Sequence, residues 1–77
     1  MGAKSIPEAF GEVLRECRAK AGISQEQLAL QADLDRTYIS LLERGLRQPT
    51  LETVFRLAGV LGVSAGTMVS RTATLVG

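Results

Sequence analysis

Residues 24–49, SQEQLALQADLDRTYISLLERGLRQP, decide how this chain folds. Ser24 and Gln27 have the spacing of a capping box, so a helix is expected to begin directly after Ser24. Apolar residues then recur at spacings of three and four, which predicts one buried stripe made of Leu28, Ala29 and Ala32. Because Ala29 is small, it lets a second helix approach closely.

A turn and a second helix follow this stripe. Asp33 falls at the turn, and aspartate tolerates the positive φ of such turns better than most residues other than glycine. Leu34 is expected to be buried, and Asp35 can cap a helix over about residues 36–44. Gly45 is expected to end that helix, because a residue in this position often adopts the left-handed conformation.

The second helix has one apolar side and one polar side. Ile39 and Leu42 are expected to point inward, with Tyr38 at the edge. The opposite side carries Arg36, Thr37, Ser40, Leu41 and Arg44. Two short helices joined by a tight turn, the second with such a face, are the layout of a helix-turn-helix, which offers its second helix to the major groove of DNA.

A further helix is predicted before this motif. Ser5 and Glu8 form a second possible capping box, and an apolar stripe follows as Phe10, Val13, Leu14 and Cys17. Gly22 is expected to close this helix. Cys17 lies on the stripe, so we interpret it as a core residue and not as a reactive thiol.

Two more helices are predicted after the motif. Thr50 can cap a fourth helix ending at Gly62, with an apolar stripe formed by Leu51, Val54, Leu57, Ala58 and Leu61. Ser64 can cap a fifth, which we end near Arg71 because Gly66 and a β-branched run weaken it. The predicted fold is all-α, with five helices in a single domain over residues 1–77. Its core spans about 6–71, and the tail at 72–77 either frays or joins a dimer interface.

The composition excludes several classes of protein. The chain has 77 residues, one cysteine and no histidine, so a disulfide framework or a Cys/His zinc site cannot form within it. No coherent set of catalytic residues is visible, and we therefore expect no enzyme activity, no metal and no cofactor. No signal peptide and no apolar run of ~20 residues is seen, so a cytoplasmic protein without a membrane partner is expected.

Overall charge does not by itself indicate nucleic-acid binding. The formal net charge is only +1, so any affinity for DNA must come from a local cluster of cations. Arg36, Arg44 and Arg47 lie close together in sequence and form such a cluster. The alternative interpretation is a solvated arginine face without a binding role.

The order S-Q-x-x-L-A, then D-R-T-Y-I-S, then E-R-G with a proline four residues later, resembles the lambda-repressor/Cro-like (XRE-type) helix-turn-helix family over about residues 8–70. The chain also resembles the controller proteins of restriction–modification systems, which are short, all-helical dimers that regulate their own genes. D-R-T-Y-I-S together with Arg47 is typical of those controllers. The same string occurs in stand-alone regulators of the wider family.

The resemblance implies a role for each residue of the motif. Gln25 is implied to touch a phosphate and to brace a side chain of the second helix. The residues assigned to base reading are Arg36, Thr37, Ser40 and Leu41. Those assigned to the DNA backbone are Gln25, Tyr38, Arg44 and Arg47, and Tyr38 and Ser40 can serve either the backbone or adjacent bases.

Two of these assignments also have a direct physical basis. Arginine bidentate to guanine is the commonest specific base contact, and Arg36 stands at the helix N-terminus, where side chains enter the groove. Leu41 is apolar and cannot hydrogen-bond to a base. It either packs on a thymine methyl group or only covers the domain's own core.

The sequence thus predicts a transcription regulator that binds a near-palindromic double-stranded DNA operator as a homodimer, without a small-molecule ligand. Six apolar residues near the C-terminus exceed what one small core needs, namely Val60, Val63, Met68, Val69, Leu75 and Val76. The first four of these are assigned to the dimer interface. The alternative is an antitoxin or another protein-interaction module with the same fold. Activation and repression cannot be distinguished, because they depend on where the operator lies.

Overall fold

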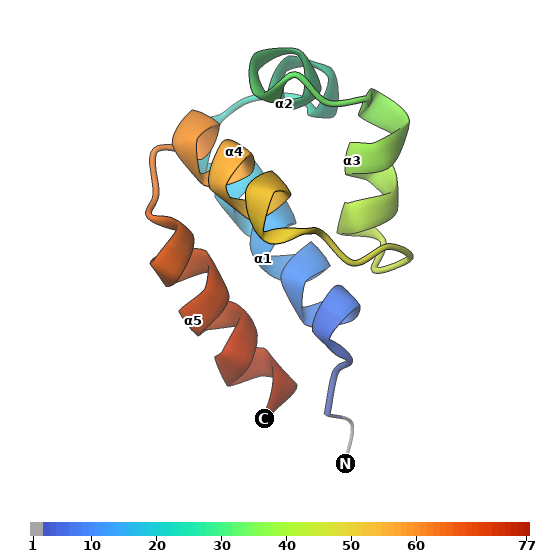
Figure 1. Ribbon diagram of the computed structural model, residues 1–77, viewed down its shortest axis with the longest axis vertical. Helices are drawn as coiled ribbons and strands as arrows, with labels where there is room; N and C mark the ends of the chain where they lie inside the picture. The colour runs from blue at the N-terminus through green and yellow to red at the C-terminus, as the bar shows by residue number, and fades with distance from the viewer. Residues whose placement is uncertain (1–2) are drawn as a thin grey trace.

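The computed structural model describes residues 3–77, and within them the chain forms five helices and no strand. The helices are α1 (Ile6–Ala21), α2 (Gln25–Ala32), α3 (Arg36–Glu43), α4 (Leu51–Leu61) and α5 (Ala65–Val76). Helix α1 packs against α3, α4 and α5, while α2 packs against α3 and α4. Figure 1 shows α3 and α5 on opposite sides of α1. The predicted all-α architecture is confirmed.

Each helix begins at the predicted cap. The side chains of Ser5, Ser24, Asp35, Thr50 and Ser64 all accept a hydrogen bond from a backbone N–H in the first turn. Both predicted capping boxes are present, because the side chains of Glu8 and Gln27 also accept from the N–H of their cap residues. Such caps typically contribute about 1 kcal/mol each.

The turn between α2 and α3 has the backbone that the sequence predicted. Asp33 has φ 57°, and it is the one residue other than glycine with a positive φ among residues 3–77. The N–H of Leu34 donates to the carbonyl of Ala29 at 2.8 Å, which closes the turn. Helix α3 ends at Glu43, with Arg44 as its cap and Gly45 in the left-handed conformation.

The core is formed by the predicted apolar stripes, with one exception. Val13, Leu14, Leu28, Ile39, Leu42, Leu57 and Met68 are fully buried. Cys17 is buried among them, as predicted. Leu51 was expected on the stripe of α4, but it is 72% exposed. It is the first residue of that helix, and its side chain is left largely in solvent.

Helix α5 is longer than the sequence predicted, since it continues past Arg71 to Val76. Thr72 is buried, and its hydroxyl donates to the carbonyl of Met68 at 2.7 Å. Leu75 packs against the core, and Arg71 forms an ion pair with Glu16 of α1 at 2.5 Å. The packing of α5 against α1 outweighs the weak helix propensity of the β-branched run.

No single helix within residues 3–77 is long and apolar enough to cross a membrane. Helices α4 and α5 are long and apolar enough only when they are taken together, and they are bent by 111° relative to each other.

Candidate nucleic-acid interface

Helix α3 separates its apolar and polar residues as predicted. Ile39 and Leu42 are fully buried, and Tyr38 is half-buried against the core. Arg36, Thr37 and Arg44 are exposed, while Ser40 and Leu41 are half-buried. The apolar side of α3 therefore packs against the rest of the domain, and the polar side faces solvent.

Three of the predicted base-reading residues meet a residue of α2 at one place. Arg36, Thr37 and Ser40 line a polar hollow on the surface together with Gln25, the first residue of α2. The N-termini of α2 and α3 therefore lie beside the same hollow, and helix N-termini attract phosphate through their unpaired N–H groups. Leu41 is not among the lining residues.

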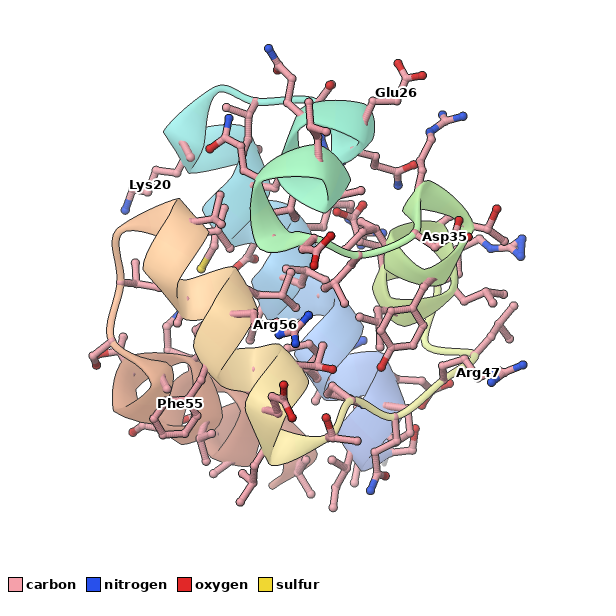
Figure 2. The ribbon with its side chains drawn as sticks, turned by 45° about the horizontal axis from the view of Figure 1, so that its top comes forward. Lys20, Glu26, Asp35, Arg47, Phe55 and Arg56 are labelled. Carbon is pink, nitrogen blue, oxygen red and sulfur yellow. The ribbon has the colours of Figure 1, made fainter. Side chains whose placement is uncertain are left out.

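The arginine cluster is available for an external partner. Arg36, Arg44 and Arg47 are exposed and form no ion pair within residues 3–77. In contrast, Arg56 and Arg71 are held by carboxylates of neighbouring side chains. Figure 2 shows Arg47 pointing outward from the loop that follows α3. The unpaired charge of the motif is thus concentrated on α3 and this loop.

A buried network around Glu43, the last residue of α3, is connected to the hollow through Gln25. Glu43 is only 5% exposed, and its carboxylate accepts two hydrogen bonds from the guanidinium of Arg18, at 2.5 and 3.0 Å. It also accepts from the side-chain amide of Gln25 at 3.0 Å. Arg18 in turn donates to the carbonyl of Ile23 at 3.1 Å, so the network joins α1, α2 and α3.

The ionisation of Glu43 is set by competition between burial and its partners. Burial is the largest single influence and would raise the pKa of this carboxyl, whereas the hydrogen bonds from Arg18 and Gln25 lower it. The nearby charges of Arg18 and Arg15 act in the same direction, so the net pKa of Glu43 is lowered. The same hydrogen bond raises the pKa of Arg18. Glu43 is therefore an anion in the folded protein at neutral pH.

This network was not predicted from the sequence, although a signal for it is present there. Glu43 follows Ile39 by four residues and Leu42 by one, so helical spacing places it on the buried edge of α3. A carboxylate in such a position must find a cation, because an unpaired buried charge is costly. Nothing in the local sequence identifies Arg18 as that cation, which lies 25 residues away.

Gly11 is a second missed residue of this region. A Cβ atom built on it would lie 2.4 Å from the carbonyl oxygen of Leu42 and 2.8 Å from that of Glu43. Helix α1 therefore approaches the last turn of α3 so closely that only glycine fits. The signal was a glycine in the interior of a helix that otherwise carries a regular apolar stripe.

The residues assigned to the dimer interface do not share one environment. Val69 is 49% exposed, whereas Val60 and Val63 are half-buried against the chain's own core. Met68 requires a correction, because it is fully buried in that core and its side chain cannot serve a partner. The pattern misled us because Met68 and Val69 are neighbours, and adjacent residues of a helix face different directions.

Other exposed apolar residues were missed as candidates for an interface. Leu51 and Phe55, one turn apart on α4, are 72% and 65% exposed, and Ile6 of α1 is 53% exposed. Ile6 and Val69 line a common hollow with mostly apolar neighbours. In Figure 2, Phe55 and Arg47 project from opposite sides of the molecule. The apolar surface of α4 and α5 is thus separate from the arginine cluster.

Comparison with known proteins gives consistent matches. The family model described as helix-turn-helix matches residues 14–67. The control protein C.BamHI of Bacillus amyloliquefaciens is 46% identical over 55 residues, covering 70% of this chain and 68% of its own length. The crystal structure of the clp gene regulator ClgR from C. glutamicum has a TM-score of 0.90 with 28% identity, covering 99% of this chain and 97% of that chain.

A third comparison includes DNA. The restriction–modification controller protein C.Esp1396I, solved as a tetramer in complex with its natural 35 base-pair operator, has a TM-score of 0.82 and 29% identity. The match covers 95% of this chain and 96% of that chain. Likeness in fold thus extends over nearly the whole chain, and likeness in sequence to the control protein C.BamHI extends over 70% of it.

Proposed function

The chain belongs to the helix-turn-helix family of DNA-binding regulators, and from that premise we propose that it is a transcription regulator that binds a near-palindromic operator as a homodimer. Helix α3 enters the major groove, with Arg36 and Thr37 at base edges. The family is one of DNA-binding regulators and not of enzymes. A cytoplasmic location is part of the same proposal.

The polar hollow formed by Gln25, Arg36, Thr37 and Ser40 carries this proposal. It combines an unpaired arginine at a helix N-terminus, two hydroxyl groups and an amide on one exposed surface. Arginine recognises guanine through two parallel hydrogen bonds, while hydroxyls and amides serve both phosphates and bases. Arg44 and Arg47 extend the same positive surface along the DNA backbone.

We propose further that the chain controls a restriction–modification system. Support comes from its likeness to the control protein C.BamHI and to the controller protein C.Esp1396I. ClgR, a regulator of clp genes, has the same fold, so the fold alone does not identify the regulated genes. Expression of neighbouring restriction and modification genes with and without this protein tests the assignment.

The dimer that we propose uses the exposed apolar surface around Val69 of α5 and Phe55 of α4. This surface lies away from α3, so two copies joined there can still present both recognition helices to one duplex. Half-sites are then expected ~34 Å apart, which is about one turn of DNA. A dimer is also needed because one helix reads too few base pairs for useful specificity.

Selection from a random pool of duplex DNA tests the function. The expected result is an enriched near-palindrome whose half-sites are separated by ~10 base pairs or a multiple of this distance. Log affinity for the selected duplex should fall with log salt, by roughly 0.9 for each phosphate neutralised. No enrichment, or an affinity that does not depend on salt, would contradict the proposal.

A further inference from the structure

The network around Glu43 joins a buried carboxylate to Gln25, a residue of the polar hollow. Gln25 and Glu43 are separated by 18 residues, yet the amide nitrogen of Gln25 donates to Oε1 of Glu43 at 3.0 Å. Gln25 is half-buried and lines the hollow, whereas Glu43 is buried and is not among the lining residues. The hydrogen bond thus connects the end of α3 with the start of α2.

This contact restricts Gln25 and leaves part of its amide for a ligand. A glutamine amide has two N–H donors and one carbonyl acceptor, and Glu43 accepts from only one of these donors. The remaining N–H and the carbonyl oxygen are available beside Arg36 and Thr37. A long side chain held in this way has already lost the rotamer freedom that binding would otherwise remove.

Only a carboxylate can fill the position of Glu43. Its two oxygens accept three N–H donors, two from Arg18 and one from Gln25. A glutamine of the same shape would offer one acceptor and bring two donors of its own, so at least one partner would be displaced. The charge of Arg18 also compensates that of Glu43, and therefore the buried carboxylate does not repel DNA phosphate.

We propose that Glu43 is a positioning residue for operator binding, which holds the amide of Gln25 in place to donate to a backbone phosphate, with Arg18 orienting the carboxylate. This role depends on the proposed function, because it requires that the hollow contacts DNA. Operator binding then depends on a buried side chain as well as on the exposed residues of the hollow.

A double-mutant cycle on the selected operator duplex tests this role. Glu43→Gln is expected to weaken binding by about fivefold for each half-site, the size of one ordinary hydrogen bond. In a Gln25→Ala background the same substitution should cause no further loss. Glu16→Gln is the matched control, because Glu16 pairs with Arg71 on the α5 side of α1 and should leave affinity unchanged.

A methylphosphonate at each backbone position identifies the phosphate in question. Neutralising that phosphate should weaken binding by the wild-type protein and by Glu16→Gln, but not by Glu43→Gln. Urea unfolding of each variant shows that the binding assays compare folded proteins. A merely structural role for Glu43 would change stability without this dependence on one phosphate.

The outcomes separate this role from the proposed function. Equal losses with and without Gln25, or no loss at all in Glu43→Gln, would overturn the positioning role and leave DNA binding intact. Failure of the wild-type protein to bind any duplex would overturn the function and this role together. NMR signals of the Gln25 side-chain amide, recorded without DNA, should be sharp and well dispersed in the wild type. If these NMR signals do not change in Glu43→Gln, the proposed restraint of the Gln25 side chain by Glu43 is refuted.

Discussion

Substitution of Gly11 by alanine tests how closely α1 and α3 must approach. The new Cβ would lie 2.4 Å from the carbonyl oxygen of Leu42, about 1.0 Å short of the 3.4 Å at which ordinary contact begins. Both oxygens in the way are backbone atoms, so the last turn of α3 must recede. Such overpacking costs about 1–3 kcal/mol, and the gain in helix propensity returns up to about 1 kcal/mol of this.

We therefore expect Gly11→Ala to lower the free energy of unfolding by about 1–2 kcal/mol, measured by urea titration with circular dichroism. In a domain of this size that loss lowers Tm by roughly 5–15 °C. Operator affinity should fall too, because α3 carries the base-reading residues and would be displaced.

Gly59→Ala is the matched control for this experiment. Gly59 lies in α4, is exposed, and has no atom within 4 Å of an added Cβ. Alanine there should raise the free energy of unfolding by up to about 1 kcal/mol, since only the helix-propensity effect remains. If Gly11→Ala proved as stable as Gly59→Ala, the close approach of α1 and α3 would be refuted.

Three further predictions concern acid stability, dimerisation and Leu41. The folded-state pKa of Glu43 is lowered from its ordinary value of 4.5, so its network stabilises the protein above that pH and loses this effect as pH falls through the folded pKa. The difference in unfolding free energy between wild type and Glu43→Gln should therefore shrink below about pH 4.5, and a constant difference in urea titrations down to pH 3 would contradict the network. Val69→Glu should sediment as a folded monomer at micromolar concentration, while Leu30→Glu, at an 83% exposed site of α2, stays dimeric. A dimeric Val69→Glu would show that the partner surface lies elsewhere. For Leu41, replacing a contacted thymine by uracil should weaken binding by the wild type but not by Leu41→Ala, and equal effects on both proteins would exclude packing on the methyl group.

Local features of the fold could be predicted because each is encoded within a few residues. The caps at Ser5 and Ser24, the positive φ of Asp33 and the buried edge of α3 each depend on spacings of one turn or less. The grouping of Arg36, Thr37 and Ser40 follows from the same helical spacing, together with the likeness to known regulators.

Features that depend on contacts between distant segments could not be predicted. Helix α5 continues to Val76 because it packs against α1, which local propensity does not contain. The partner of Glu43 is Arg18, and the constraint on Gly11 comes from carbonyl groups of α3, both more than 20 residues away. The assignment of Met68 to a dimer interface failed for the same reason. Apolar character does not reveal whether a side chain is buried in its own domain or exposed to a second copy.

The most direct test of the central claim compares Arg36→Ala and Arg47→Ala on the selected operator and on every single base-pair variant of it. We expect Arg36→Ala to lose about 1–3 kcal/mol of discrimination at one base pair of each half-site and to retain preference elsewhere. Arg47→Ala should weaken all duplexes about equally and reduce the slope of log affinity against log salt by about one. If Arg36→Ala kept full discrimination at every position, or if the two variants exchanged these behaviours, α3 would not read DNA in the way described.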